Sequence, residues 1–362
     1  MRIGSSKWQG ARSGRGSAPA QLGVKRGSAG TNPRLGFAVA APLAFYAVAL
    51  LGCSSAGTAS GAESAASVEG GSAGATPEPH TPPGPLVRPS GRMTLSEAQR
   101  YVLALVNRDR AEHGLKPVTW SDIPAKAGQR QADDMAAHGF TAHLGTDGSV
   151  PELRYTQAGG KGMVMENVGC FADAEPRVLD PTGKFTAEGL EKIQHAFMDE
   201  IPPFDGHRRN ILTPYHTSFG VGLALTAKLD VPCMAQEFVD DFGDFDDLPR
   251  KATVGTKIKV RGALRPPAEF GGVGVARVAT PKPLKPKALN KTGSYAIPKP
   301  ATTYFPKGFK TPIPVQVDGN TFSIELPLSV EGKPGLYQIS IWAKLPPSKD
   351  LVMVSLRTID VH

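Results

Sequence analysis

The chain has 362 residues, with 41 Lys or Arg against 33 Asp or Glu and a formal net charge of +8. Because one hydrophobic core rarely grows past roughly 250 residues, this length predicts two ordinary domains and additional segments. The charge is no argument for a nucleic-acid partner, since no basic-aromatic motif accompanies it.

The charge is divided unevenly along the chain. Residues 1–52 hold seven basic and no acidic side chains. Residues 53–250 hold 17 basic and 27 acidic side chains, a net charge of −10, and residues 251–362 hold 17 and 6, a net charge of +11. An acidic half followed by a basic half indicates two modules that attract each other or have different partners.

The N-terminal segment is predicted to be a targeting signal. A basic, acid-free stretch ends at Arg34 and precedes the apolar run LGFAVAAPLAFYAVALLG, which ends before Cys53. This run suits a signal-peptide core or a short membrane span. Its ending, LLGC, resembles the bacterial lipobox, in which the peptide is cut before a Cys that is then lipidated. We therefore predict a signal peptide with a basic leader over residues 1–52 and a lipid anchor on Cys53. The predicted location is extracytoplasmic, at a bacterial outer membrane, and secretion or a single-span anchor is the alternative.

The chain has three cysteines, Cys53, Cys170 and Cys233. A lipid on the first leaves an even pair in an oxidising compartment, which predicts a disulfide between Cys170 and Cys233. Two buried free thiols are the alternative.

A linker and a first module follow the targeting signal. Residues 53–92 are small, polar and Pro-rich, so they lack the apolar surface that offsets ordering entropy and are predicted to be disordered. The first module is predicted over residues 93–248. Its first helix begins at a capping box, Thr94 to Glu97, and Ser121 is expected to cap an Ala-rich second helix that ends at Gly139. The later segments are expected to be a polar loop at 140–160, a strand at 163–172, a helix at 186–200, a helical turn at 207–212, and strands at 219–227 and 231–239.

This order of helices, strand, helix and hairpin predicts an α+β layer fold. The remainder, residues 249–362, has no helical periodicity. Three stretches alternate apolar and polar residues, and turns occur at Asp318-Gly319-Asn320 and at the Pro-Pro-Ser-Lys-Asp sequence. We predict a small all-β domain resembling a β-sandwich.

Four residues are candidates for a functional cleft. Glu200 precedes His207 in the chain. The Pro-Pro-Phe-Asp-Gly bend between them can fold the imidazole back toward the carboxylate. His143 and Glu166 lie upstream, each in a short polar segment between apolar runs. Two imidazoles and two carboxylates could line one cleft, which is the clearest functional indication in the sequence.

A set of motifs now resembles a known family. In chain order they are VNRDRAEHGL, PVTW, FTAHLGTDGSVPELR, MENVG, GHRRNILTPYHTSFGVGLAL and QEF. In this order they resemble the CAP superfamily of cysteine-rich secretory, antigen 5 and pathogenesis-related proteins, in its bacterial SCP-like form, over about residues 95–243. The resemblance implies a CAP-type α-β-α sandwich whose cleft holds two His and two Glu.

Carried over by position, the cleft residues are His143, Glu166, Glu200 and His207. In related proteins the two histidines can hold a divalent metal, so Zn²⁺ at His143 and His207 is an expectation. The chain departs from the pattern at residues 201–205, which lengthen the connection before the Gly-His pair. Asp199 or Asp205 are therefore alternatives to Glu200. Met165 stands where relatives commonly have Gly.

Three functions are compatible with these residues. The first is an envelope-anchored module that binds a lipid or another envelope component. The second is a hydrolase in which a metal on His143 and His207 activates water and Glu166 or Glu200 acts as general base. The third is a structural or adhesion protein whose basic β domain contacts an anionic envelope polymer. The lysines of that surface are Lys282, Lys285, Lys287, Lys291 and Lys299.

Overall fold

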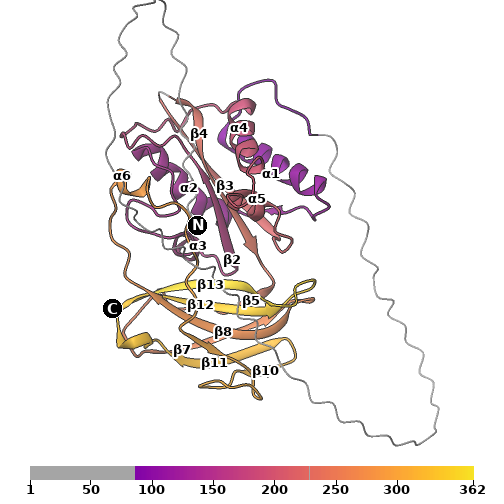
Figure 1. Ribbon diagram of the computed structural model, residues 1–362, viewed down its shortest axis with the longest axis vertical. Helices are drawn as coiled ribbons and strands as arrows, with labels where there is room; N and C mark the ends of the chain where they lie inside the picture. Colours follow the sequence, from indigo (N-terminus) through magenta and orange to yellow (C-terminus); the bar gives the residue numbers. More distant parts are fainter. Residues whose placement is uncertain (1–85, 228) are drawn as a thin grey trace, which may run out of the picture. The chain divides into compact units, whose positions relative to one another are not determined.

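The computed structural model describes residues 86–227 and 229–362 (Figure 1). The predicted signal peptide, Cys53 and most of the predicted linker lie outside these residues. No helix in the two described ranges is long and apolar enough to cross a bilayer.

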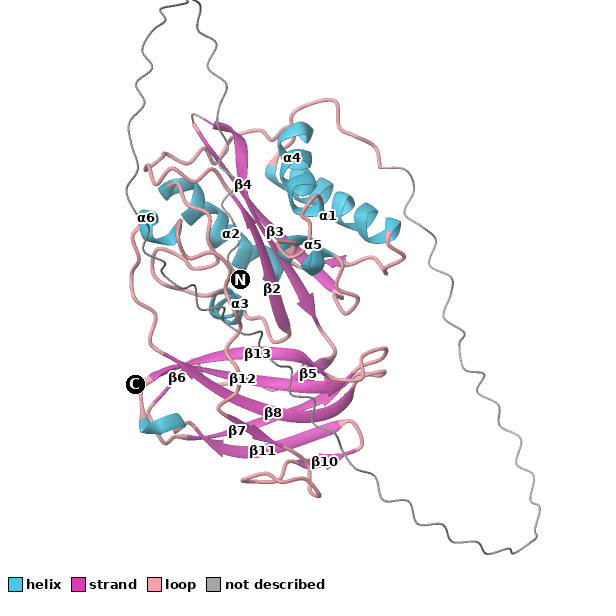
Figure 2. Ribbon diagram, viewed as in Figure 1, coloured by secondary structure: helices cyan, strands magenta, loops and turns pink. Residues whose placement is uncertain are grey.

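The first region is a four-stranded sheet with helices on both faces (Figure 2). The sheet order is β1-β3-β4-β2, with β1 parallel to β3 and the other neighbours antiparallel. The strands are β1 (Thr119–Trp120), β2 (Met163–Gly169), β3 (Ser218–Thr226) and β4 (Leu229–Asp240). The helices are α1 (Leu95–Glu112), α2 (Asp122–His138), α3 (Pro151–Ala158), α4 (Ala187–Met198) and α5 (Gly206–Ile211). Strand β2 forms one edge of this sheet.

Strand β3 separates two cores because its side chains alternate between faces. Phe219, Val221 and Leu223 are buried against α1 and α4. On the other face Gly220 and Gly222 let α2 approach the sheet closely. A Cβ atom on Gly220 would lie 2.1 Å from the backbone nitrogen of Ala125, and one on Gly222 would meet the α2 backbone at the same distance. The glycines in FGVGLAL are therefore a packing requirement of the α2 face.

The second region is all-β apart from one short helix. One sheet has the order β10-β11-β7-β5, and the other has the order β6-β13-β12-β8-β9. Apolar side chains from both sheets form one buried core. The elements are β5 (Gly243–Phe245), β6 (Lys251–Ala252), β7 (Lys257–Leu264), β8 (Glu269–Val278), α6 (Pro286–Leu289), β9 (Thr302–Tyr304), β10 (Gln316–Asp318), β11 (Thr321–Pro327), a 3₁₀ turn (Val330–Gly332), β12 (Gly335–Lys344) and β13 (Leu351–Val361).

The segment between β8 and β9, residues 279–301, is here called the strap. It contains α6 and contacts the loop that follows α2. The Leu284 N–H donates to the Thr146 carbonyl at 2.7 Å, and Leu289 is buried in the core beneath α2. The side chain of Asn290 accepts from the Thr141 N–H at 3.0 Å and donates to the Gly139 carbonyl at 3.2 Å. The basic half of the chain thereby fixes a loop of the acidic half.

Most of the predicted architecture is present. The α+β arrangement followed by two β-sheets is confirmed, and so is the capping box at Thr94. Two local expectations were wrong. The predicted loop at 140–160 contains helix α3, which begins at Pro151. Ser121 occupies the N-cap position of α2, but its side chain makes no capping hydrogen bond.

Candidate functional site

His143 is held on one face of strand β2. Its Nδ1 lies 2.9 Å from Oε1 of Glu166, and the other carboxylate oxygen of Glu166 accepts from Arg154 at 2.7 Å. The same Arg154 nitrogen donates to the His143 carbonyl at 3.0 Å. The Glu166 and Arg154 side chains are fully buried, whereas 15% of the His143 side chain is exposed. The imidazole is thus the solvent-facing member of a buried group.

Charge pairing explains how Glu166 stays ionised. Burial by itself would raise the pKa of this carboxyl group, but the Arg154 guanidinium and the His143 hydrogen bond outweigh burial and lower the pKa. Arg154 lies in helix α3, within the stretch 140–160 that was expected to be a loop. This helix therefore provides the cation that the site requires. The motif FTAHLGTDGSVPELR contains this arginine, but the motif alone does not indicate its role.

His207 forms a second pair with Glu200. Nδ1 of His207 lies 2.6 Å from Oε1 of Glu200, and the other oxygen accepts the His207 backbone N–H at 2.8 Å. The His207 ring also packs on Phe197, with the ring centroids 4.6 Å apart. The lengthened connection through Pro202 and Pro203 therefore leaves Glu200 in contact with the imidazole. Asp205, the alternative, forms an ion pair with Arg209 instead.

Strand β2 is the element that joins the two pairs. Glu166 and Asn167 are consecutive residues, so their side chains point to opposite faces of the sheet. Glu166 binds His143 on one face. On the other face the Asn167 side chain donates to the His207 carbonyl at 3.2 Å and accepts from Asn210 at 2.9 Å. Consecutive residues of one edge strand thus contact both pairs, Glu166 through the His143 ring and Asn167 through the His207 backbone.

A further buried acid, Glu237, adjoins this group and was missed by sequence reasoning. It lies in β4 directly opposite Glu166 in the strand register. Neither of its oxygens has a hydrogen-bond partner among the described residues. Burial and then the negative charge of Glu166 raise its pKa well above the ordinary value. Glu237 therefore keeps its proton beside the ionised Glu166.

Residues 103–238 match the family model of the cysteine-rich secretory protein family, CAP. They form a CAP domain.

No curated protein sequence matches the chain. Two solved structures that resemble it are bacterial. One is an extracellular protein containing an SCP domain from Bacillus anthracis, with 19% identity over 42% of this chain and 45% of that chain and a TM-score of 0.31. The other is an outer surface protein from Borrelia burgdorferi, with 12% identity over 41% of this chain and 97% of that chain and a TM-score of 0.32. The match thus spans less than half of the first structure.

The two imidazoles of the CAP domain have a donor arrangement that suits a metal. In metal sites a carboxylate commonly holds one ring nitrogen of a ligating His, which fixes the tautomer and leaves the other nitrogen for the ion. Glu166 and Glu200 hold Nδ1 of His143 and His207 in this way, and Nε2 of both rings has no hydrogen-bond partner in the described structure. However, no group of three or more His, Cys, Asp or Glu within residues 86–362, position 228 aside, is arranged to hold an ion. Each imidazole thus offers Nε2 as a donor, and the described residues bring no group of three or more such ligands together.

His216 has a structural role that its sequence context did not reveal. It is buried, with Nδ1 2.6 Å from the Asp240 carboxylate and Nε2 2.9 Å from the Asn210 carbonyl. Both ring nitrogens are occupied, so this imidazole ties α5 to the end of β4. His195, in contrast, is exposed on α4.

The predicted disulfide is confirmed. Cys170, just after β2, is bonded to Cys233 in β4 across a sequence separation of 63 residues. The bond lies beside the buried residues that cover α2, and the Cys170 carbonyl accepts from the Thr141 hydroxyl at 2.6 Å. It therefore braces the end of β2 close to the His143 loop.

One pocket lies apart from the His-Glu pairs. A pocket of about 330 Å³ lies where the turn after α3 faces strand β5, and none of its lining residues belongs to either pair. Donor atoms rather than volume determine metal binding, so the side chains at β2 are the candidates for metal chemistry.

Proposed function

We propose that the protein is an extracytoplasmic CAP-domain binding module in which His143 and His207 hold a divalent metal and a ligand of the cell envelope. The supporting observation is that a carboxylate holds Nδ1 of each imidazole, which leaves Nε2 as the ligating nitrogen. The bound ion would supply a positive charge and open coordination positions, because two imidazoles are only half of the usual ligand set of structural zinc. An oxygen-bearing lipid or envelope component would complete that set.

The positions of the two glutamates favour binding over hydrolysis. A general base must reach the water that it deprotonates. The fully buried Glu166 is held by Arg154 and His143. Glu200 already accepts the His207 backbone N–H and contacts its ring. Both carboxylates are therefore engaged in orienting imidazoles, which is the role that a binding site requires.

The disulfide supports the location. Disulfides persist in oxidising compartments and are rare in the cytosol. The Cys170–Cys233 bond is therefore consistent with the predicted export of the chain. A lipid on Cys53 would then keep the CAP domain at the envelope, which is where we place the ligand.

Calorimetric titration of the purified protein with Zn²⁺ tests the metal site. We expect His143→Ala and His207→Ala each to weaken binding at least about tenfold, because each removes one of two protein ligands. His195→Ala is the matched control, since it removes an exposed histidine from α4. Equal zinc binding by the wild type and both site variants would refute the metal proposal. Native mass spectrometry of protein isolated from envelopes then identifies the ligand.

A second function is favoured by the charge of the strap and its flanks. Residues 270–317 contain no Asp or Glu. Five lysines of this stretch are exposed, and they form no ion pair within the described chain: Lys282, Lys285, Lys287, Lys291 and Lys299. Such a surface suits an anionic envelope polymer, whose binding would weaken with salt.

The test is retention of the full chain on immobilised lipopolysaccharide in a salt series. We expect the triple variant Lys285→Gln, Lys287→Gln, Lys291→Gln to elute at lower salt than the wild type. The control replaces three exposed lysines on strands, Lys257, Lys259 and Lys344. The same elution for both triple variants would assign the effect to net charge alone.

A further inference from the structure

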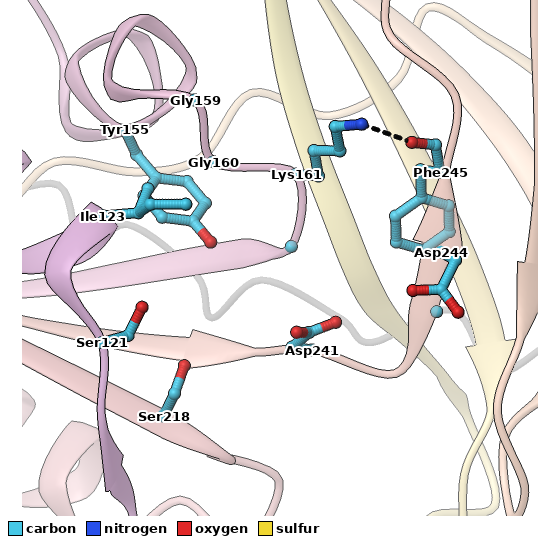
Figure 3. A pocket seen from close by; sticks show the side chains of 12 residues that line it. Ser121, Ile123, Tyr155, Gly159, Gly160, Lys161, Ser218, Asp241, Asp244 and Phe245 are labelled. Carbon is cyan, nitrogen blue, oxygen red and sulfur yellow. Dashed lines mark hydrogen bonds between the residues drawn. The ribbon is translucent and has the colours of Figure 1, made fainter.

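The pocket of about 330 Å³ has polar groups directed into it from several elements (Figure 3). It is independent of the metal proposal, because it contains neither histidine of the cleft. One wall is the end of α3 with the Gly159-Gly160 turn, and another is the segment from Asp241 to Phe245. Its volume is at the lower end of the roughly 300–1,000 Å³ that small-molecule sites occupy.

Tyr155 provides a fixed hydrogen-bond donor in the first wall. Its ring lies against Gly160, where a Cβ atom would come within 2.3 Å of the ring, so only glycine fits at that position. Burial raises the pKa of this hydroxyl, so it stays protonated. The hydroxyl proton is therefore available to a ligand in the pocket.

Asp241 and Asp244 provide fixed acceptors in the second wall. Arg265 bridges them, with one guanidinium nitrogen 2.5 Å from Oδ1 of Asp241 and the other 2.7 Å from Oδ1 of Asp244. The second oxygen of each carboxylate has no hydrogen bond within residues 86–227 and 229–362. Figure 3 shows both carboxylates at the pocket. Arg265 thus orients them and offsets part of their charge.

Two serines complete the polar lining. Ser121 stands at the N-cap of α2, a position where Ser normally bonds a backbone N–H of the first turn. Its side chain makes no such bond, so its hydroxyl is left for the pocket. Ser218, at the start of β3, also lines the space. Figure 3 shows both serine side chains among the residues that line the pocket.

We propose that this pocket binds a single neutral sugar unit. A sugar ring presents several hydroxyl groups that both donate and accept, which matches one donor at Tyr155, acceptors at Asp241 and Asp244, and hydroxyls at Ser121 and Ser218. Hydrogen bonds to ionised acceptors are the strong ones, so the carboxylates would supply most of the affinity.

The charges of the lining favour this class of ligand over others. Two carboxylates repel an anion. A cation would gain little, because the Arg265 guanidinium already pairs with both carboxylates. An apolar ligand would contact Ile123 but would leave the hydroxyl and carboxylate groups of the lining without partners. A neutral polyhydroxyl molecule is the class that remains.

The experiment is saturation-transfer NMR and calorimetric titration of the full chain with D-glucose, D-galactose and N-acetylglucosamine. We expect at least one of the three sugars to bind. Tyr155→Phe, Asp241→Asn and Ser121→Ala should each weaken that binding, by roughly tenfold for the first two. Tyr304→Phe and Asp318→Asn are matched controls outside the pocket and should bind like the wild type.

Thermal unfolding of each variant identifies any that fails to fold. If Tyr155→Phe unfolds, Asp241→Asn and Ser121→Ala decide the question. The absence of binding by all three sugars would overturn the proposal, and so would equal binding by the wild type and every folded pocket variant. Binding of inorganic phosphate or ammonium in place of a sugar would overturn the class of ligand.

Discussion

Glu166 and Glu237 lie directly opposite each other on β2 and β4, and both residues are buried. Two carboxylates at such a position would repel each other, and like charges directly opposite in a sheet are destabilising. The arrangement is stable because Arg154 neutralises Glu166 and a proton neutralises Glu237. Glu166 thus orients His143, and the protonated Glu237 lies opposite Glu166 on β4.

This pair makes stability depend on pH. Glu237 has a raised pKa in the folded state, so between its ordinary value near 4.5 and its folded value the native state binds the extra proton. Stability therefore falls as pH rises through that window, by up to about 1.4 kcal/mol per pH unit. Glu237→Gln removes this group, so we expect urea unfolding from pH 5 to 8 to be less pH-dependent in the variant. Glu325→Gln, at an exposed position on β11, is the control. Parallel pH profiles for the wild type and Glu237→Gln would contradict the assigned proton.

Arg154 is expected to be the most sensitive position of the cleft. It is buried and bonds Glu166, the His143 carbonyl and the Ser149 carbonyl. Arg154→Met leaves Glu166 as an uncompensated buried charge, which should cost roughly 3–5 kcal/mol of unfolding free energy. The measurement is chemical denaturation. In the double variant with Glu166→Gln, part of this loss should be recovered, because the stranded charge is gone. Strictly additive losses would show that the two residues are not coupled.

The sequence was informative where one physical rule dominates. Alternation of apolar and polar residues predicts β7, β11, β12 and β13, and the Thr94–Glu97 box predicts the start of α1. Helix α3 was missed because eight residues after a Gly- and Asp-rich loop are too few for a clear period. Strand β8 was missed for another reason. Its Gly272 and Gly274 lie where a Cβ atom would crowd Tyr304 and Pro300, so close packing replaces the alternating pattern.

The cleft was predictable in part. His143, Glu166, Glu200 and His207 were named from motifs, and the structure joins them as two His-Glu pairs. Glu237 was not named, although it lies in the QEF motif. Its role depends on the register between β4 and β2, and the sequence does not show that register. The sequence of the strap likewise does not indicate its contact with the His143 loop, because Asn290 and Thr141 are far apart in the chain.

The strap gives a prediction about the His143 loop. Asn290→Ala removes the acceptor of the Thr141 N–H and the donor to the Gly139 carbonyl. We expect a loss of roughly 1–3 kcal/mol and faster hydrogen exchange of the Thr141 amide. Hydrogen-exchange mass spectrometry of peptides covering residues 139–149 measures this effect. Asn320→Ala, in the exposed β10–β11 turn, should leave the exchange of these peptides unchanged. Unaltered exchange in Asn290→Ala would mean that the loop is held without the strap.

The disulfide gives a prediction about the same loop from the opposite side. Reduction of Cys170–Cys233 releases a closed loop of about 63 residues, which should lower the unfolding free energy by roughly 2–4 kcal/mol. Urea unfolding with and without dithiothreitol measures the change. The double variant Cys170→Ser, Cys233→Ser is the control, because its stability should not respond to the reductant. Since Cys170 also accepts from Thr141, reduction should loosen the His143 loop and weaken zinc binding together with stability. Zinc affinity that survives reduction unchanged would show that the disulfide does not help to position this histidine.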